Sequence, residues 1–355
     1  MSSISPIPFY TRGEELPNLL KKRILILDGA MGTMIQQYKL SEEDYRGLPE
    51  NQRFIGHMVD VKGNNELLVL TQPQIILKIH EQYLEAGADI IETNTFGATS
   101  VAQEDYKMAG LSREMNEAAA RIARDACLKY SSQLKPRFVA GAIGPTPKTA
   151  SISPDVNDPG ARNITFDALR SSYREQIEGL FKGGVDLFLV ETIFDTLNAK
   201  AALFALDEFF EETGERLPVM ISGTVTDASG RILSGQTVEA FWNSLRHIRP
   251  LTFGLNCALG AALMRPYIAE LARICDAAIS CYPNAGLPNP MSDTGFDETP
   301  EITSQLVDGF AKDGLVNLVG GCCGTTPDHI RAIAKAVSNR IPRAFYREDE
   351  GMSTE

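Results

Sequence analysis

Eight short apolar runs, rich in β-branched residues, recur along the chain and alternate with amphipathic stretches. Runs of this length predict buried strands, and the stretches between them predict helices. The predicted strands are residues 24–28, 89–94, 137–144, 186–192, 218–224, 252–257, 277–282 and 316–321. The predicted helices are residues 74–86, 112–130, 165–182, 196–212, 237–247, 261–275 and 327–338. This alternation is typical of a parallel sheet covered by helices.

Eight parallel strands, each followed by a helix, fit a closed barrel better than a doubly wound sheet. The latter would favour G-x-G-x-x-G after its first strand, and DGAMGT at residues 28–33 lacks that spacing. We therefore predict an α/β fold, a single-domain (β/α)8 TIM barrel over residues 19–341, with loops inserted after strand 1 (40–65) and strand 3 (144–163). The polar ends, 1–18 and 342–355, are expected to be flexible tails.

Composition excludes several classes of function. A net charge of −12 disfavours binding to nucleic acid and to anionic lipid surfaces. The sequence has no apolar run long enough to span a membrane and no secretory signal pattern, so a cytoplasmic location is expected. Six cysteines in 355 residues are too sparse for a disulfide scaffold.

Three of these cysteines follow predicted strands. Cys257 ends the sixth strand, and Cys322 and Cys323 follow the eighth. In a barrel all three would meet at the C-terminal rim, where active sites form, and neighbouring glycines would let the adjacent pair share a metal. Three thiolates suit zinc and leave one position for a substrate. Because the sequence has no C-x-x-C pair, buried apolar cysteines or a structural zinc site remain alternatives.

Such a metal would act on a thiol substrate. A thiol that coordinates zinc loses its proton and can then attack a methyl donor. Cys127, Cys275 and Cys281 fall within predicted helices or a strand and are interpreted as buried residues rather than ligands.

Carboxylates also stand at predicted strand ends: Asp28, Glu92 and Glu191. Together they suit the ammonium group of an amino acid, although any one of them could instead cap a helix or anchor a loop. The four histidines, His57, His80, His247 and His329, are not placed for acid–base chemistry.

Several motifs resemble the homocysteine S-methyltransferase family over about residues 20–341. They are DGAMGT at 28–33, LNC at 255–257 and GGCCGTTP at 320–327. The segments at 92–96, 148–158, 221–236 and 283–286 most closely resemble the N-terminal homocysteine module of cobalamin-dependent methionine synthase.

The resemblance implies that Cys257, Cys322 and Cys323 bind zinc and present homocysteine as a zinc thiolate. It also implies that Asp28 and Gly29 hold the amino acid end of homocysteine together with Glu191. Asn284, in the P-N-A-G segment, matches an asparagine that can occupy the open position of zinc before substrate arrives.

Methylcobalamin is the methyl donor that the resemblance implies. The sequence has no D-x-H-x-x-G pattern for the lower ligand of cobalamin. We therefore expect a partner chain or module with the folate and cobalamin sites, either because the enzyme is split or because this chain is a fragment. The alternatives are a stand-alone homocysteine methyltransferase that uses S-methylmethionine or betaine, and a zinc-binding or redox-sensing protein.

Overall fold

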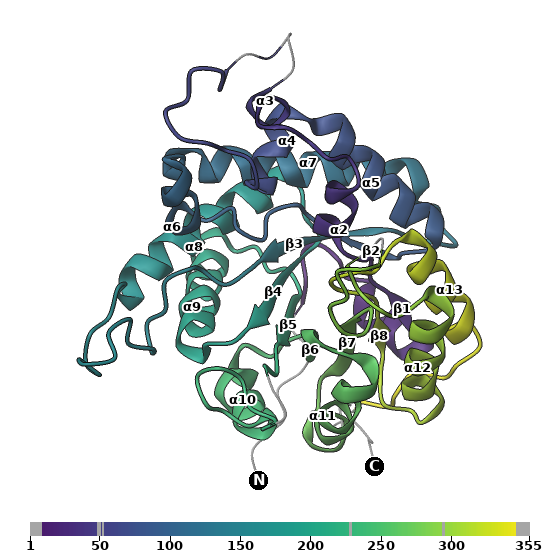
Figure 1. Cartoon of the computed structure of the whole chain (residues 1–355). Helices are drawn as coiled ribbons and strands as arrows, with labels where there is room; N and C mark the ends of the chain where they lie inside the picture. The colour runs from purple at the N-terminus through teal and green to yellow at the C-terminus, as the bar shows by residue number, and fades with distance from the viewer. Residues whose placement is uncertain (1–8, 48–50, 52, 227–228, 293–294, 346–355) are drawn as a thin grey trace.

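The computed structural model describes residues 9–47, 51, 53–226, 229–292 and 295–345. Its eight parallel strands pair in the order β1-β8-β7-β6-β5-β4-β3-β2, and helices surround them (Figure 1). A parallel bridge between Leu27 and Ile90 joins the two ends of the sheet, and the amide of Asp28 donates to the Ile90 carbonyl at 3.1 Å. The predicted (β/α)8 TIM barrel is confirmed.

The strands are β1 (Leu25–Ile26), β2 (Ile90–Glu92), β3 (Phe138–Ile143), β4 (Leu187–Ile193), β5 (Val219–Gly223), β6 (Thr252–Gly260), β7 (Ala278–Asn284) and β8 (Leu318–Val319). The α-helices are α1 (Leu16–Lys22), α2 (Met31–Gln36), α3 (Glu42–Arg46), α4 (Leu68–Thr71), α5 (Pro73–Ala86), α6 (Ser100–Gln103), α7 (Ser112–Tyr130), α8 (Phe166–Gly183), α9 (Thr196–Thr213), α10 (Val238–Leu245), α11 (Ala261–Ile274), α12 (Pro300–Lys312) and α13 (Pro327–Val337). Short 3-10 turns are Asn65–Leu67, Glu104–Tyr106, Ala109–Leu111 and Arg246–Ile248.

Alternating strand side chains build two apolar layers. Leu25 and Leu27 belong to the cluster inside the barrel, whereas Ile24 and Ile26 belong to the cluster between strands and helices. Because both faces of each strand are covered, the strands read as continuous apolar runs. All eight predicted strands and all seven predicted helices are present, with shifts of one or two residues at most ends.

The sequence did not predict every helix. The chief omission is α12 between β7 and β8, whose buried side carries Thr303 and Ser304 among its apolar residues. The polar residues interrupt the apolar stripe on which the prediction relied.

The insertion after β1 is organised rather than irregular. It contains α3, and the Arg46 guanidinium donates to the carbonyls of His57 at 2.8 Å and Val59 at 3.1 Å. Glu42 accepts the amides of Val61 and Lys62. These bonds fix the approach to Asn65–Leu67, a turn at the rim of the barrel. Residues 144–163 after β3, all described, form neither helix nor strand.

Parts of the expected tails pack against the barrel. Tyr10 and Leu16 are buried, and Arg12 donates to the carbonyls of Phe181 and Val185. At the other end, the Arg343 guanidinium donates to the Ala277 carbonyl at 3.0 Å. Residues 9–18 and 342–345 were expected to be flexible, but apolar and arginine side chains anchor them to the barrel. Residues 1–8 and 346–355 of the expected tails lie outside the described part. Within the described ranges, no helix has both the length and the apolar character needed to cross a bilayer.

Candidate active site

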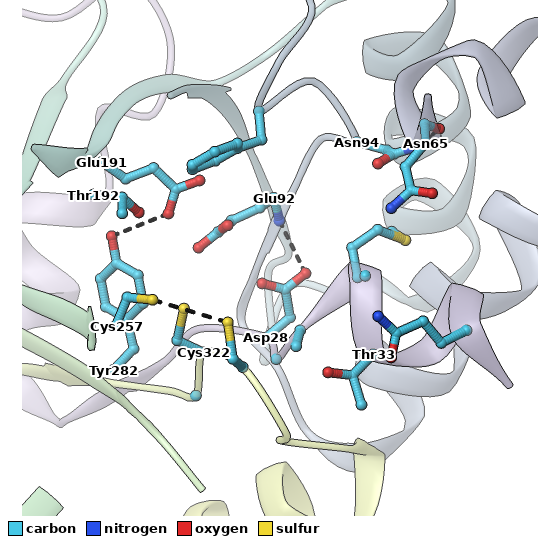
Figure 2. Close-up of a pocket in the computed structure, with 18 of the residues that line it drawn as sticks. Asp28, Thr33, Asn65, Glu92, Asn94, Glu191, Thr192, Cys257, Tyr282 and Cys322 are labelled. Atoms are coloured by element: carbon cyan, nitrogen blue, oxygen red, sulfur yellow. Dashed lines mark hydrogen bonds between the residues drawn. The ribbon is translucent and has the colours of Figure 1, made fainter. Parts of the chain in front are cut away.

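The three cysteines predicted as metal ligands meet at the C-terminal ends of the strands. Cys257 lies in β6, and Cys322 and Cys323 follow β8 after two glycines. Their sulfur atoms all lie within 4.8 Å of one another, and the sulfurs of Cys257 and Cys323 are 3.9 Å apart. Figure 2 shows the sulfurs of Cys257 and Cys322 at the pocket. The barrel therefore brings together residues that are far apart in the sequence.

The backbone departs from strand geometry where each ligand stands. Cys257 and Ala258 have φ of 59° and 57°, and the pairing of β6 with β7 shifts register between Asn256 and Gly260. Left-handed backbone is uncommon outside glycine, and it is enriched at functional sites. After β8, Gly324 has φ of 80° within a turn in which the Thr325 amide donates to the Cys322 carbonyl at 3.1 Å.

The charges of the sulfur cluster indicate a site for a cation. The pKa of Cys257 is lowered to about 3 because the thiols of Cys322 and Cys323 donate hydrogen bonds to its sulfur. The pKa of Cys322 is raised well above its usual range, mainly because it donates to Cys257. For the same main reason the pKa of Cys323 is raised to about 11. One thiolate held by two thiols is a donor set that a soft divalent metal can bind in place of the protons.

Asn284, the last residue of β7, completes this side of the site. Its side chain is 4% exposed and donates to the sulfur of Cys257. Its Oδ1 is buried without a hydrogen-bond partner among the described residues. Buried amide oxygens are rarely left unpaired, so this atom is available as a further ligand. The donor set therefore fits a metal ion.

Three carboxyl groups lie next to the sulfur cluster in the same pocket, as Figure 2 shows for Asp28, Glu92 and Glu191. Asp28 follows β1 and accepts the amide of Glu92 at 3.0 Å, which joins the first two strands. Its other oxygen is buried and has no hydrogen-bond partner within the described part of the chain. Glu191 lies in β4, and the Tyr282 hydroxyl donates to it at 3.4 Å. The predicted convergence of these carboxyls is confirmed.

Burial raises the pKa of all three carboxyls. It raises the pKa of Asp28 well above its usual range, opposed by the amide of Glu92 and reinforced by the charge of Glu191. The pKa of Glu92 is raised well above its usual range by burial and then by the charges of Glu191 and Asp28. Burial, with a contribution from Cys257, raises the pKa of Glu191 to about 8. A bound ammonium would relieve this mutual repulsion.

Gly29 brings the backbone close to its neighbours. A Cβ at this position would lie 2.8 Å from the Thr325 hydroxyl oxygen and 2.9 Å from the Tyr83 ring. The Thr325 hydroxyl also accepts the Ala30 amide at 3.2 Å. Only glycine fits here without displacing these side chains, and the exposed backbone edge can face a small ligand.

The three cysteines, the three carboxyls and Gly29 line one cavity of about 430 Å³, a volume in the usual range for small-molecule sites, whereas Asn284 lies behind its lining. Its wall away from the cysteines includes Asn65, Glu66 and Asn94. The Asn94 amide donates to the Asn65 carbonyl at 2.7 Å, and Glu66 accepts the Gly97 amide at 2.8 Å. None of these three residues was assigned a role from the sequence. Asn65 ends the insertion after β1 and Glu66 follows it, and neither carried a strand-end signal.

Two further residues tie the walls together, and neither was assigned a role from the sequence. The Asn256 side chain accepts the Thr192 amide at 3.1 Å and donates to the Thr192 hydroxyl at 2.8 Å. It also contacts the sulfur of Cys322 at 3.8 Å. The position of Asn256 inside the LNC motif was the available signal.

The remaining cysteines and the histidines lie away from this cavity, as the sequence predicted. Cys127, Cys275 and Cys281 are buried, and no histidine lines the cavity. His329 faces the N-terminus of its own helix, where its ring contacts Thr326.

A sequence model of the homocysteine S-methyltransferase family matches residues 25–337. Among solved structures, the chain is similar to the homocysteine methyltransferase MmuM from Escherichia coli. Its metallated form gives a TM-score of 0.68 at 22% identity, covering 90% of this chain and 98% of that one. Its oxidized form gives 0.68 at 21% identity, with coverage of 90% and 98%. Its apo form gives 0.62 at 22% identity, with coverage of 90% and 97%. The family match extends from the first strand of the barrel to its last helix, and the chain therefore belongs to the homocysteine S-methyltransferase family.

Proposed function

We propose that this chain binds homocysteine beside a zinc ion and activates its thiol for methylation to methionine. Cys257, Cys322 and Cys323 hold the metal, and the carboxyl-lined wall holds the amino acid end of the substrate. The observation that carries the proposal is one cavity lined by both a three-sulfur cluster and three buried carboxyls.

The two ends of homocysteine match the two walls of the cavity. Its ammonium would be held by Asp28, Glu92 and Glu191, because a bound cation stabilises the ionised form of carboxyls whose pKa burial and mutual repulsion raise. Its carboxylate would face the backbone at Gly29 and Ala30, at the start of α2. Zinc, when bound, supplies the chemistry that lowers the pKa of the substrate thiol, and a chain with three sulfur ligands leaves a position for that thiol.

Methyl transfer then follows from the orientation of the substrate. The thiol proton is lost to solvent, and the sulfur attacks the methyl carbon in line with the bond that breaks. A carbon–sulfur bond forms, and the electron pair of the broken bond leaves with the donor. Asn284 would hold the metal site closed to water until the substrate thiol arrives.

The proposed donor is methylcobalamin carried by a partner chain or module, in the manner of cobalamin-dependent methionine synthase. The sequence motifs of the homocysteine module support this choice, and the given sequence lacks the D-x-H-x-x-G pattern. A large donor would have to approach at the mouth of the cavity, at the C-terminal ends of the strands.

A donor comparison tests the proposal. Purified, zinc-loaded protein is given homocysteine with methylcobalamin, S-methylmethionine or betaine, and methionine is measured over time. We expect methionine formation from methylcobalamin only. Turnover with either small donor, without methylcobalamin turnover, would establish the stand-alone alternative. If no donor reacts and homocysteine leaves the zinc X-ray absorption spectrum unchanged, the zinc-binding or redox-sensing alternative is favoured. The observation that suits this alternative is the 3.9 Å distance between the sulfurs of Cys257 and Cys323.

A further inference from the structure

A single buried amide connects the sulfur cluster to the carboxyl wall. Asn256 is fully buried and directly precedes Cys257 in β6. Its side chain makes four contacts, and their partners lie on three other segments: β4, β5 and the loop after β8. No other described side chain is shown to join the Glu191 segment to a cysteine of the cluster in this way.

The first pair of contacts holds the segment that carries Glu191. Thr192 has φ of 54°, an unusual conformation for a β-branched residue. The amide oxygen of Asn256 accepts the Thr192 backbone amide, and its Nδ2 donates to the Thr192 hydroxyl. The pairing of β4 with β5 shifts register at this point, between Val190 and Ile193. The amide thereby fixes the turn that aims Glu191 into the cavity.

The second pair of contacts fixes and directs the amide itself. The Ser222 hydroxyl donates to Oδ1 at 2.7 Å. Because the Thr192 backbone amide can only donate, Oδ1 must face it, and a flipped side chain would lose this bond. The orientation therefore places an N–H group toward the sulfur of Cys322, with nitrogen and sulfur 3.8 Å apart.

We propose that Asn256 is a positioning residue that donates an N–H···S hydrogen bond to the metal-bound sulfur of Cys322. This bond couples the metal to the carboxyls that hold the substrate. The inference rests on the proposed zinc site. Hydrogen bonds to metal-ligating sulfur withdraw electron density from it and hold its orientation. The same amide that reduces the charge of this ligand also holds Thr192, next to Glu191. Removal of its donor group would disturb both ends of the substrate site together.

Nuclear magnetic resonance can observe the bond directly in the unaltered chain. Protein loaded with an NMR-active cadmium isotope should show scalar coupling between cadmium and a side-chain amide proton of asparagine. The coupling should be absent from Asn256→Asp. Cadmium bound by three sulfurs without this coupling in either protein would overturn the inference. Failure of cadmium to bind the three cysteines would instead overturn the proposed metal site, so the two failures are distinguishable.

The Asn256→Asp variant gives a second readout, since Asp keeps the shape and the accepting oxygen but lacks the N–H group. In the cobalt-substituted protein we expect the sulfur-to-metal charge-transfer bands to move to lower energy. Metal affinity, measured by chelator competition, should fall about 10- to 100-fold. The matched control is Thr252→Val, also fully buried in β6, whose hydroxyl bonds Ser280 outside the cluster. Identical spectra and affinities for the two variants would reduce Asn256 to a structural residue and overturn the proposal.

Discussion

Substitution of Glu191 by glutamine should separate substrate binding from metal binding. The residue is 5% exposed, and its carboxyl accepts hydrogen bonds from the Tyr282 hydroxyl at 3.4 Å and from the Glu92 carboxyl. Glutamine keeps the volume and one oxygen but loses the charge that would pair with the homocysteine ammonium. The three cysteines do not contact Glu191 by a hydrogen bond, so metal content should remain unchanged.

The size of the effect follows from burial. Truncation of one partner of a buried charge pair costs about 2 to 5 kcal/mol. Asp28 and Glu92 remain in the wall to share the ammonium, which places the expected loss at about 2 to 3 kcal/mol, a rise of roughly 30- to 150-fold in the Kd of homocysteine. The substrate-free variant should also be more stable, because it no longer buries a carboxyl group beside two others.

Isothermal titration of homocysteine into zinc-loaded protein, without donor, measures this Kd. Tyr282→Phe is the matched comparison, since it removes a single long hydrogen bond to the same carboxyl and should change the Kd only a few-fold. An unchanged Kd in Glu191→Gln with full metal content would refute the assignment of the carboxyl wall. A loss of metal in that variant would contradict the separation of the two walls.

Three other perturbations test the remaining parts of the site. Cys322→Ser should lower bound zinc from near one equivalent to little, as measured by elemental analysis. The control Cys127→Ala, which changes a buried cysteine elsewhere, should keep its metal. Full metal content in both variants would remove Cys322 from the ligand set. The metal-free protein should lose stability as pH rises from about 4.5 to about 8. Over this range the unfolded chain has lost the Glu191 proton, whereas the folded chain, in which the pKa of Glu191 is raised to about 8, still holds it. The loss for this group is at most about 1.4 kcal/mol per pH unit. Denaturant titrations should show a shallower slope in Glu191→Gln, and an equal slope would contradict the raised pKa. Gly29→Ala should cost about 1 to 3 kcal/mol of stability through overpacking, since its Cβ would lie 2.8 Å from the nearest oxygen. It should also weaken homocysteine binding. An unchanged Kd and Tm would show that the backbone at this position moves freely.

The barrel and the meeting of the three cysteines could be predicted because they depend on strand order alone. Parallel strands covered on both faces read as apolar runs, and every strand of a barrel ends at the same rim. The contacts of Asn256 could not be predicted in this way. They require positive φ at Thr192 and Cys257, and those conformations arise where neighbouring strands change register. Hydrophobic periodicity carries no information about such local departures.

The wall formed by Asn65 and Glu66 was missed for a different reason. These residues lie at the end of the insertion after β1 and directly after it, where the bonds of Arg46 and Glu42 with distant backbone groups decide the path of the chain. The sequence marks this segment only as polar. The helix α12 was missed because its buried side includes Thr303 and Ser304.

The barrel divides the site between its two halves. Every carboxyl of the wall precedes β5, whereas every sulfur of the cluster follows it. Under the proposed function, recognition of the amino acid and activation of its sulfur are therefore encoded by separate portions of the chain. A protein that has lost its metal should still bind norleucine, which has the amino acid end but no sulfur, and it should discriminate between the two mirror-image forms. Chirality would be selected by one half and reactivity by the other.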